Sequence, residues 1–419
     1  MRLNNINFQQ IYSKTISKNS YLSHGIHPYT AKLIPHIPRY FIENYTVEND
    51  IVLDPFCGSG TSLLEARILA RNSIGFDINP LATLISNVKT TPLEKKELVS
   101  AIVKIKKGLK ENNEKTLVNF PNIDYWFSKK AQKELASIKW NIECLNSELP
   151  ENINNFLFVT FSSIIRKSSY ADPRMAKTYK SKRVTDKINN GWVSTPIQYF
   201  NEALDKNVGM MSSLSEYLKS NNNYVKTCTG DVRNISVLLK KIDIKKANFI
   251  ITSPPYINAQ DYFRSYKLEI WWLGLATNKK LANLKKHSIG TENISGCNKD
   301  EKPMCEDKGL QTILNKLWKK DKLKSYIVLN YFKDMNSTLS KFNNALESGG
   351  HLCLITGNNT ICEMLIPTNQ ILNRMTKELG FEQVEITKDE IKNRALAPNR
   401  NHNGGIIKEE WITVFKKNG

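Results

Sequence analysis

The sequence predicts an α/β fold in which a mostly parallel, seven-stranded sheet carries a mainly helical insertion. Short apolar runs typical of buried strands alternate with helix-forming stretches in both the first and the second half of the chain. A glycine-containing loop joins the first clear strand to a helix, the usual opening of a nucleotide-binding α/β unit. Residues 93–222 break the alternation and read mostly as helix. At 419 residues the chain accommodates one large domain or two ordinary ones.

The first predicted unit is a strand over residues 51–53, a loop over 54–61 and a helix over 62–70. The loop reads Asp-Pro-Phe-Cys-Gly-Ser-Gly-Thr. Its glycines let a ligand approach the backbone, and the N-terminus of the following helix favours a negative group such as a carboxylate. The loop matches neither the dinucleotide pattern GxGxxG nor a phosphate-binding loop, because it has no Gly-Lys-Ser/Thr.

The second predicted strand, residues 73–76, ends at Asp77 and is followed by a helix over 81–88. Asp77 stands 23 residues after Asp54. An acidic residue at this distance, at the end of the second strand, is placed to accept hydrogen bonds from the two hydroxyls of a ribose.

The remaining predicted elements restore the α/β pattern after the helical stretch. Further helices are predicted over 261–272 and 369–379, and a polar loop over 394–405. The five remaining strands are predicted over residues 224–228, 248–252, 351–355, 384–387 and 411–415.

Residues 252–256, Thr-Ser-Pro-Pro-Tyr, follow the fourth of these seven strands. Proline has no N–H to donate to a sheet, so the chain must leave the strand as a stiff loop. That loop offers a hydroxyl, free backbone carbonyls and an aromatic ring, which together can hold a planar amine by its edge and its face. The alternative is a rigid turn with a packed tyrosine.

The charge balance indicates a polyanionic partner. The chain has 60 Lys and Arg against 40 Asp and Glu, a net charge of +20, which favours nucleic acid; a lysine-rich proteome with solvated lysines is the alternative. The most basic stretch, residues 166–187, also holds Tyr170 and Tyr179, a mixture suited to phosphates and unpaired bases, although an exposed loop would look the same. The candidate DNA-binding residues are Arg166, Lys167, Arg174, Lys177, Lys180, Lys182 and Arg183.

Several classes of protein do not fit the sequence. No stretch of 18 apolar residues predicts a membrane span, and the N-terminus lacks the apolar core of a signal peptide. Seven scattered cysteines without a CxxC pair favour reduced thiols, a cytoplasmic location and no zinc site. No carboxylate or cysteine cluster supports His24 and His27 as metal ligands.

Taken in order, the loop at 54–61, Asp77, the Gly-Asp pair at 230–231 and the loop at 252–256 resemble the S-adenosylmethionine-dependent amino-methyltransferases of DNA. Residues 27–32, His-Pro-Tyr-Thr-Ala-Lys, are similar to the HPYPAK-like segment that precedes the cofactor loop in that family. The resemblance implies a Rossmann-like class I methyltransferase fold. A serine before Pro-Pro-Tyr is most typical of the cytosine-N4 branch, whereas Asp or Asn is typical of adenine-N6 enzymes.

The resemblance also implies a role for each matching residue. Ser253 and the Pro254 carbonyl would accept hydrogen bonds from the target amine, Tyr256 would stack on the extruded base, and no metal is needed. The catalytic loop would comprise Ser253, Pro254, Pro255 and Tyr256. The residues expected to bind S-adenosyl-L-methionine are His27, Tyr29, Lys32, Asp54, Phe56, Gly58, Gly60, Thr61, Asp77 and Asp231.

The expected division has five parts. Residues 1–92 hold the N-terminal segment and cofactor-binding half, 93–222 the helical candidate recognition region, 223–276 the catalytic half, 277–325 a second, basic insertion, and 326–419 the rest of the catalytic domain. Which insertion reads the DNA sequence stays open.

The expected activity is site-specific cytosine-N4 methylation of double-stranded DNA in a restriction–modification system. Adenine-N6 methylation is the alternative, with RNA methylation and non-catalytic DNA binding behind it. Cytosine-C5 methylation is excluded because no Pro-Cys dipeptide supplies the nucleophile. No nuclease constellation is evident, so a restriction endonuclease partner would be a separate chain.

Overall fold

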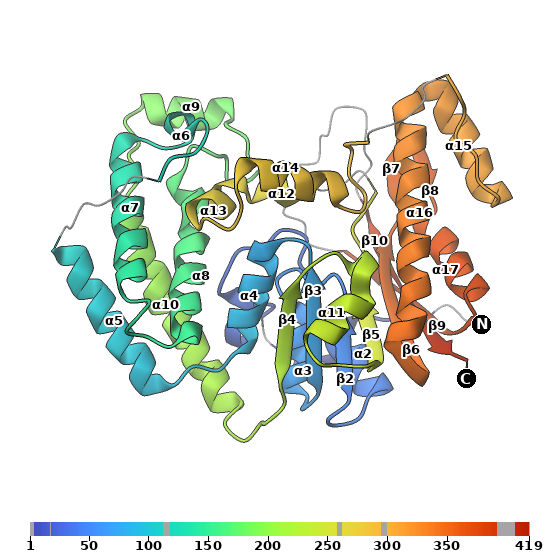
Figure 1. The fold of residues 1–419 in the computed structure, drawn as a ribbon, viewed down its shortest axis with the longest axis horizontal. Helices are drawn as coiled ribbons and strands as arrows, with labels where there is room; N and C mark the ends of the chain where they lie inside the picture. The colour runs from blue at the N-terminus through green and yellow to red at the C-terminus, as the bar shows by residue number, and fades with distance from the viewer. Residues whose placement is uncertain are drawn as a thin grey trace.

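The computed structural model describes residues 4–16, 18–111, 118–257, 262–294, 300–391 and 407–418. Its centre is one eight-stranded sheet with the strand order β1-β9-β10-β6-β5-β2-β3-β4 (Figure 1). The sheet strands are β1 (Asn4–Asn5), β2 (Ile51–Asp54), β3 (Asn72–Asp77), β4 (Val225–Thr229), β5 (Ala247–Thr252), β6 (Leu346–Gly357), β9 (Phe381–Glu390) and β10 (Glu409–Lys417). A separate hairpin pairs β7 (Asn359–Ile361) with β8 (Met364–Ile366).

The sheet confirms the predicted Rossmann-like fold. Strands β4, β3, β2, β5 and β6 run parallel, and β10 lies antiparallel between β6 and β9. All seven predicted strands are present. The eighth, β1, is a two-residue edge strand beside β9, too short to leave a sequence pattern. From β2 the chain builds outward to β3 and β4, then returns to place β5 on the other side of β2, and ligands of such sheets bind where the order reverses.

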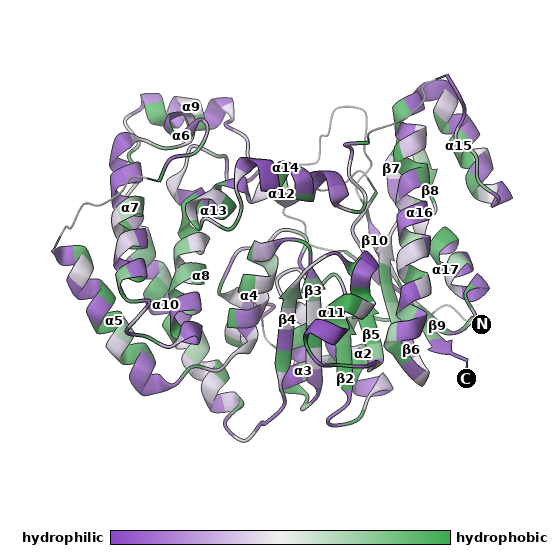
Figure 2. Ribbon diagram, viewed as in Figure 1, coloured by the Kyte–Doolittle hydropathy of each residue, from purple (hydrophilic) through white to green (hydrophobic). Residues whose placement is uncertain are grey.

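The alternation of apolar residues along the central strands divides the core into two layers. Phe249 and Ile251 pack on one face with helix α2 (His36–Tyr45), whereas Ile250 packs on the other face with α11 (Ile235–Lys241) and α16 (Lys322–Ala345). These strands are hydrophobic along their length in Figure 2, as expected for parallel strands buried on both faces. Helices α3 (Thr61–Ile68) and α17 (Thr368–Glu378) complete the covering layers.

The predicted helical insertion forms a lobe at the left of Figure 1. It packs through α8 against α4 (Pro80–Thr90) and α13 (Lys267–Trp272), and Trp272 is fully buried with Phe127 and Phe161 edge-on to its ring. Because this core is continuous with α4, the lobe packs, through that helix, beside β3 and β4. Its helices are α5 (Lys95–Lys110), α6 (Ile123–Trp126), α7 (Lys129–Cys144), α8 (Glu151–Ser168), α9 (Lys182–Asn189) and α10 (Pro196–Tyr217).

The chain after β5 crosses the top of the molecule in Figure 1, between the helical lobe and α16. The helix predicted over 261–272 is divided at Tyr266 into α12 (Tyr262–Ser265) and α13, and Asp261 lies outside the described residues. Residues 277–325 contain α14 (Asn278–His287) and α15 (Lys308–Lys320). The loop predicted over 394–405 also lies outside the described residues.

Three short helical segments complete the structure: α1 (Phe8–Ile11), η1 (Leu22–Gly25) and η2 (Val232–Asn234). Among the helices in the described ranges, none has both the length and the apolar character that a bilayer crossing requires.

Candidate active site

One pocket gathers most of the predicted site residues at the carboxyl edge of the sheet. Asp54, Asp77 and Thr252 are the last residues of β2, β3 and β5, so parallel pairing brings the three strand ends together. His27 and Gly60 are predicted cofactor residues that do not line it. The predicted residues that do line it are Tyr29, Lys32, Asp54, Phe56, Gly58, Thr61, Asp77, Lys177, Asp231, Ser253, Pro254, Pro255 and Tyr256.

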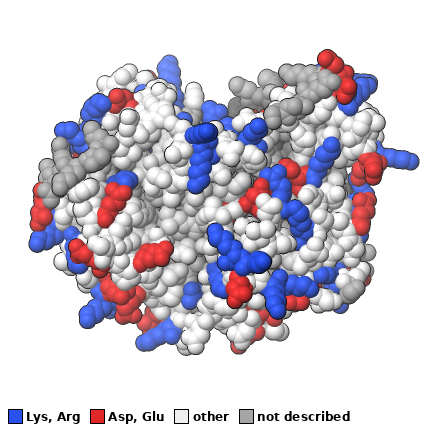
Figure 3. Space-filling view, viewed as in Figure 1, with Lys and Arg blue, Asp and Glu red and all other residues white. Residues whose placement is uncertain are grey.

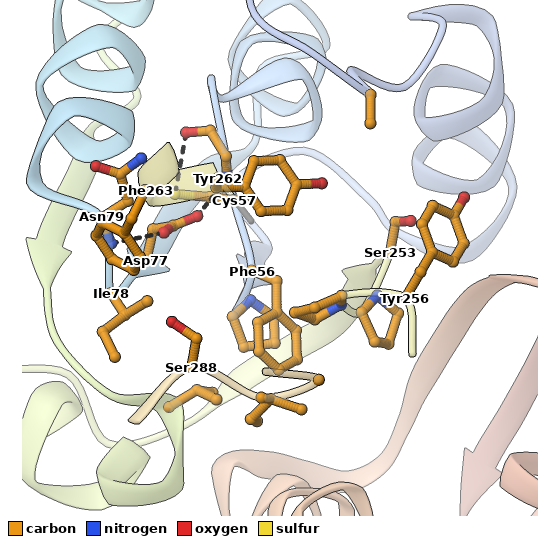
Figure 4. A pocket seen from close by; sticks show the side chains of 18 of the residues that line it. Phe56, Cys57, Asp77, Ile78, Asn79, Ser253, Tyr256, Tyr262, Phe263 and Ser288 are labelled. Atoms are coloured by element: carbon orange, nitrogen blue, oxygen red, sulfur yellow. Dashed lines mark hydrogen bonds between the residues drawn. The ribbon is translucent and has the colours of Figure 1, made fainter. Parts of the chain in front are cut away.

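Asp54 ties the cofactor loop to the catalytic loop. Its Oδ1 accepts hydrogen bonds from the Thr252 hydroxyl at 2.8 Å and from the Phe56 backbone N–H at 3.1 Å. Burial raises the pKa of Asp54 to about 6 in spite of these bonds. Both loops therefore take their starting positions from one carboxylate. In Figure 4 Phe56 lies between the group around Asp77 and the group around Ser253.

Asp77 is held by the backbone of the loops on either side of it. The Gly58 N–H donates to Oδ2 at 3.0 Å and the Asn79 N–H donates to Oδ1 at 2.8 Å. Burial raises the pKa of Asp77 to about 6, and the two N–H groups oppose that rise. At neutral pH the side chain is thus a fixed, ionised acceptor at the pocket wall (Figure 4).

Gly60 acts behind the pocket rather than in its lining. It is the N-cap of α3 with a φ of 76°, a left-handed conformation that favours glycine. A Cβ at this position would lie 2.5 Å from the Cβ of Ser86 in α4. The missing side chain therefore lets the start of α3 pack directly on α4.

The Ser-Pro-Pro-Tyr loop is braced from two directions. The Tyr256 hydroxyl donates to Glu410 Oε1 of β10 at 3.2 Å. Burial and the nearby Glu410 carboxylate raise the pKa of Tyr256 well above its ordinary value, so the hydroxyl keeps its proton. On the other side Gly290 approaches so closely that a Cβ there would stand 2.7 Å from the Tyr256 carbonyl oxygen. Ser253 and Tyr256 lie side by side in Figure 4.

A stack of three tyrosines joins the N-terminal segment to the chain after the catalytic loop. The Tyr29 ring lies parallel to Tyr266 at 4.8 Å and to Tyr262 at 6.2 Å between centroids. The Tyr266 hydroxyl donates to Thr30 Oγ1 at 2.8 Å and accepts the Thr30 N–H. The sequence indicated only Tyr29, because its partners come from α12 and the residue after it, more than 230 positions away in the chain.

His27 is a structural link in this same segment. Its ring is buried between Ser162 Oγ, at 3.0 Å from Nε2, and the Pro28 carbonyl, at 2.8 Å from Nδ1. Burial lowers the pKa of His27 to about 3, which keeps the ring neutral. The histidine therefore fixes the N-terminal segment to α8.

Asp231 is already engaged by an arginine two residues along the chain. Arg233 Nη2 lies 2.6 Å from Asp231 Oδ2 and donates to the His287 carbonyl at 2.5 Å, while Nη1 lies 3.0 Å from Asp334 Oδ1. Burial tends to raise the pKa of Asp231, but the hydrogen bonds from Arg233 outweigh it and hold the pKa below its ordinary value. One guanidinium thus joins η2, α14 and α16.

A wall of the pocket comes from the second insertion, where the sequence predicted no site residue. The stretch is less charged than its Lys-rich surroundings, which is the only local sign of its role. Ile78, Asn79, Val232, Tyr262 and Phe263 also line the pocket beside predicted residues. The wall consists of Lys285, His287, Ser288, Ile289, Gly290, Thr291, Glu292 and Asn293.

The basic stretch divides into residues that face the pocket and residues that stabilise the lobe. Lys177 lines the pocket. Arg166 instead donates to the backbone carbonyls of Ala176 and Ser265, each at 3.1 Å, so its guanidinium braces the loop that follows α8. These bonds argue against Arg166 as a phosphate contact.

The other candidates stay at the surface. Arg174 and Arg183 each pair with the buried Asp172, at 3.2 and 3.0 Å, and keep about half of their side chains exposed. Lys180 lies 4.8 Å from the centre of the Tyr170 ring. Lys167 and Lys182 are exposed. Figure 3 shows Lys and Arg side chains spread among Asp and Glu over this face of the molecule.

This chain is similar to several known proteins. A family model described as DNA methylase matches residues 2–88. The type II methyltransferase M.MvaI of Kocuria varians is 25% identical over 411 residues, covering 94% of this chain and 89% of that protein. M.BsoBI of Geobacillus stearothermophilus, also a type II methyltransferase, is 23% identical over 460 residues, covering 98% and 88%.

By these matches the chain resembles the DNA amino-methyltransferases. S-Adenosylmethionine is its cofactor. Among solved structures, the rRNA methyltransferase aviRa of Streptomyces viridochromogenes covers 93% of this chain and 87% of its own at 10% identity. Its TM-score of 0.34 is too low to support an inference.

Proposed function

We propose that this protein transfers the methyl group of S-adenosylmethionine to the exocyclic N4 amine of a cytosine in DNA. The observation that carries the proposal is the single pocket lined by both the 54–61 loop and the Ser-Pro-Pro-Tyr loop, joined by the bond between Asp54 and Thr252. When bound, the cofactor supplies an electrophilic methyl group on a positively charged sulfur, so a neutral amine can act as the nucleophile without a metal.

The donor set of the pocket fits this cofactor. Asp77 is an ionised acceptor suited to the two ribose hydroxyls, and the ionised Asp231 is suited to the adenine amino group. Ile78 and Val232 offer apolar surface for a flat base. Gly58 leaves its part of the loop open to a close approach. The 54–61 loop would then hold the methionine end, with Tyr29 above it.

The catalytic loop positions the amine and changes its reactivity. Ser253 Oγ and the Pro254 carbonyl accept hydrogen bonds from the two N–H groups of the target amine. Bonds in these directions pull the nitrogen lone pair out of conjugation with the ring, where it can attack. Tyr256 stacks on the extruded base, and its bond to Glu410 fixes the ring. Positioning and electrostatics supply the acceleration.

The target base follows from the first residue of the loop. A serine at position 253 supports cytosine-N4, and adenine-N6 methylation is the alternative that uses the same chemistry. The type II names of the relatives support a place in restriction–modification. The endonuclease would be a separate chain, because the sequence shows no nuclease constellation, and the scattered cysteines favour a cytoplasmic location. Lys177 at the pocket, the half-buried Lys180 and the exposed Arg174, Lys182 and Arg183 would contact the phosphate backbone.

Mass spectrometry of nucleosides from DNA treated with the protein and S-adenosylmethionine tests the proposal. N4-methylcytosine is expected; N6-methyladenine would overturn the base assignment, and no methylated base would overturn the function. Ser253→Ala should slow transfer by roughly 100-fold, in line with the loss of one preorganised contact to the reacting group, while cofactor affinity stays within about twofold. Ser288→Ala, at a pocket serine without a proposed role, is the matched control.

A further inference from the structure

Two lysines lie at the base of the 54–61 loop and have no acidic partner among the residues that the structure describes. Lys89, at the end of α4, is fully buried, and its Nζ donates to Ser59 Oγ at 3.1 Å. Ser59 itself lines the pocket, so Lys89 stands one hydrogen bond behind the wall. Lys32 lines the pocket, and its Nζ donates to the His24 carbonyl at 2.9 Å.

Neither ammonium forms an ion pair with any carboxylate in the described part of the chain. Glu65, a buried acid beside His24, is engaged by His24 at 2.7 Å and by Arg39 at 3.5 Å. An ammonium has three N–H donors, and burying one with a single neutral acceptor is unfavourable. The arrangement is therefore complete only when an anion joins it.

We propose that Lys89 and Lys32 form a subsite for the carboxylate of the amino-acid end of S-adenosylmethionine, with Lys89 acting through Ser59. The proposal rests on the pocket assigned above and adds Lys89 as a positioning residue. The N-terminus of α3, which begins at Thr61 beside Ser59, favours the same charge.

Ligand binding at this subsite should be accompanied by proton uptake. Burial lowers the pKa of Lys89 well below its ordinary value, and the nearby charge of Lys32 lowers it further. The other titratable groups that interact with Lys89 are His24, His27 and Cys57. A carboxylate arriving beside the lysines raises their pKa values. At a pH between the free and bound values, ligand binding then takes up protons from solvent.

Calorimetry without DNA isolates this subsite from the transfer reaction. The probes are S-adenosylhomocysteine and S-adenosyl-3-thiopropylamine, the same molecule without its carboxylate. The wild type should prefer S-adenosylhomocysteine by about 10- to 100-fold, the range expected for a charge-assisted hydrogen bond. Titration in buffers of different ionisation enthalpy should show proton uptake for S-adenosylhomocysteine alone.

Lys89→Met keeps the length of the side chain and suits a buried position. It should cut that preference at least threefold and reduce the proton uptake, with little change in affinity for the ligand that lacks the carboxylate. Ser59→Ala should shift the preference in the same direction, and Lys96→Met, at an exposed position of α5, should change nothing.

Each further result has one meaning. If Lys89→Met keeps both the preference and the proton uptake, the subsite is refuted. The same holds if the wild type itself binds both probes equally, although the pocket assignment then stands. If the wild type binds neither probe, the proposed function fails with it.

Discussion

Substituting Gly60 by alanine should destabilise the protein and displace the 54–61 loop without removing any side chain that lines the pocket. Gly60 has a φ of 76°, and a left-handed conformation costs an alanine about 1–2 kcal/mol. The added Cβ would stand 2.5 Å from Ser86 Cβ and 2.9 Å from Ser86 Cα. Because a backbone atom cannot move aside, the overpacking adds about 1–3 kcal/mol. The free energy of unfolding should therefore fall by roughly 2–5 kcal/mol.

Gly349 provides the matched control for the backbone term. Its φ is 74°, and a Cβ there would meet no atom within 4 Å. Gly349→Ala should thus lose only the conformational part, about 1–2 kcal/mol. Urea unfolding of both variants gives the difference, and calorimetry with S-adenosylhomocysteine shows whether the displaced loop also weakens binding in Gly60→Ala alone.

Two results would contradict this expectation. Equal destabilisation in the two variants would mean that the packing against Ser86 costs nothing. Wild-type cofactor affinity in a destabilised Gly60→Ala protein would mean that the contact between α3 and α4 does not set the geometry of the loop.

Three further predictions concern charges at the pocket. Burial raises the pKa of Asp77 to about 6, and ribose hydroxyls favour the ionised form, so cofactor affinity should fall as pH drops below about 6. The Asp77→Asn variant should bind the cofactor weakly, and its affinity should change less with pH. A pH dependence as steep as that of the wild type would contradict this prediction. Arg233→Gln releases Asp231 and the His287 carbonyl and should lower the free energy of unfolding by about 1–3 kcal/mol; an unchanged urea midpoint would show that the link carries no energy. Replacing Lys177 and Lys180 by glutamine should reduce the slope of log affinity for DNA against log salt by about 2, and an unaltered slope would place both lysines outside the interface.

Much of the site was predictable because parallel strands collect their ends at one edge. The apolar runs located β2, β3 and β5, and so the positions of Asp54, Asp77 and Ser253 followed from local sequence alone. The break in the alternation likewise identified the helical lobe before its packing was known.

The rest depended on contacts that no local pattern encodes. Lys89 looks like any lysine at the end of a helix, and only the fold buries it below Ser59. Arg166 lies in a basic stretch, yet its guanidinium donates hydrogen bonds to backbone carbonyls up to 99 residues away. The pocket wall around Gly290 is positioned by its close contact with Tyr256, and no local sequence pattern at either residue predicts that contact.

Helix α4 contacts both the 54–61 loop and the helical lobe, so it connects the cofactor pocket with the candidate DNA-binding region. One end of it supports the 54–61 loop through Ser86 and Lys89, and its core side packs on α8 of the helical lobe. Any displacement of the lobe by DNA that moves α8 against α4 changes the free energy of the loop with cofactor bound. Thermodynamic reciprocity then requires the cofactor to change DNA affinity by the same factor, so a displacement of this kind would couple the two ligands through a single helix.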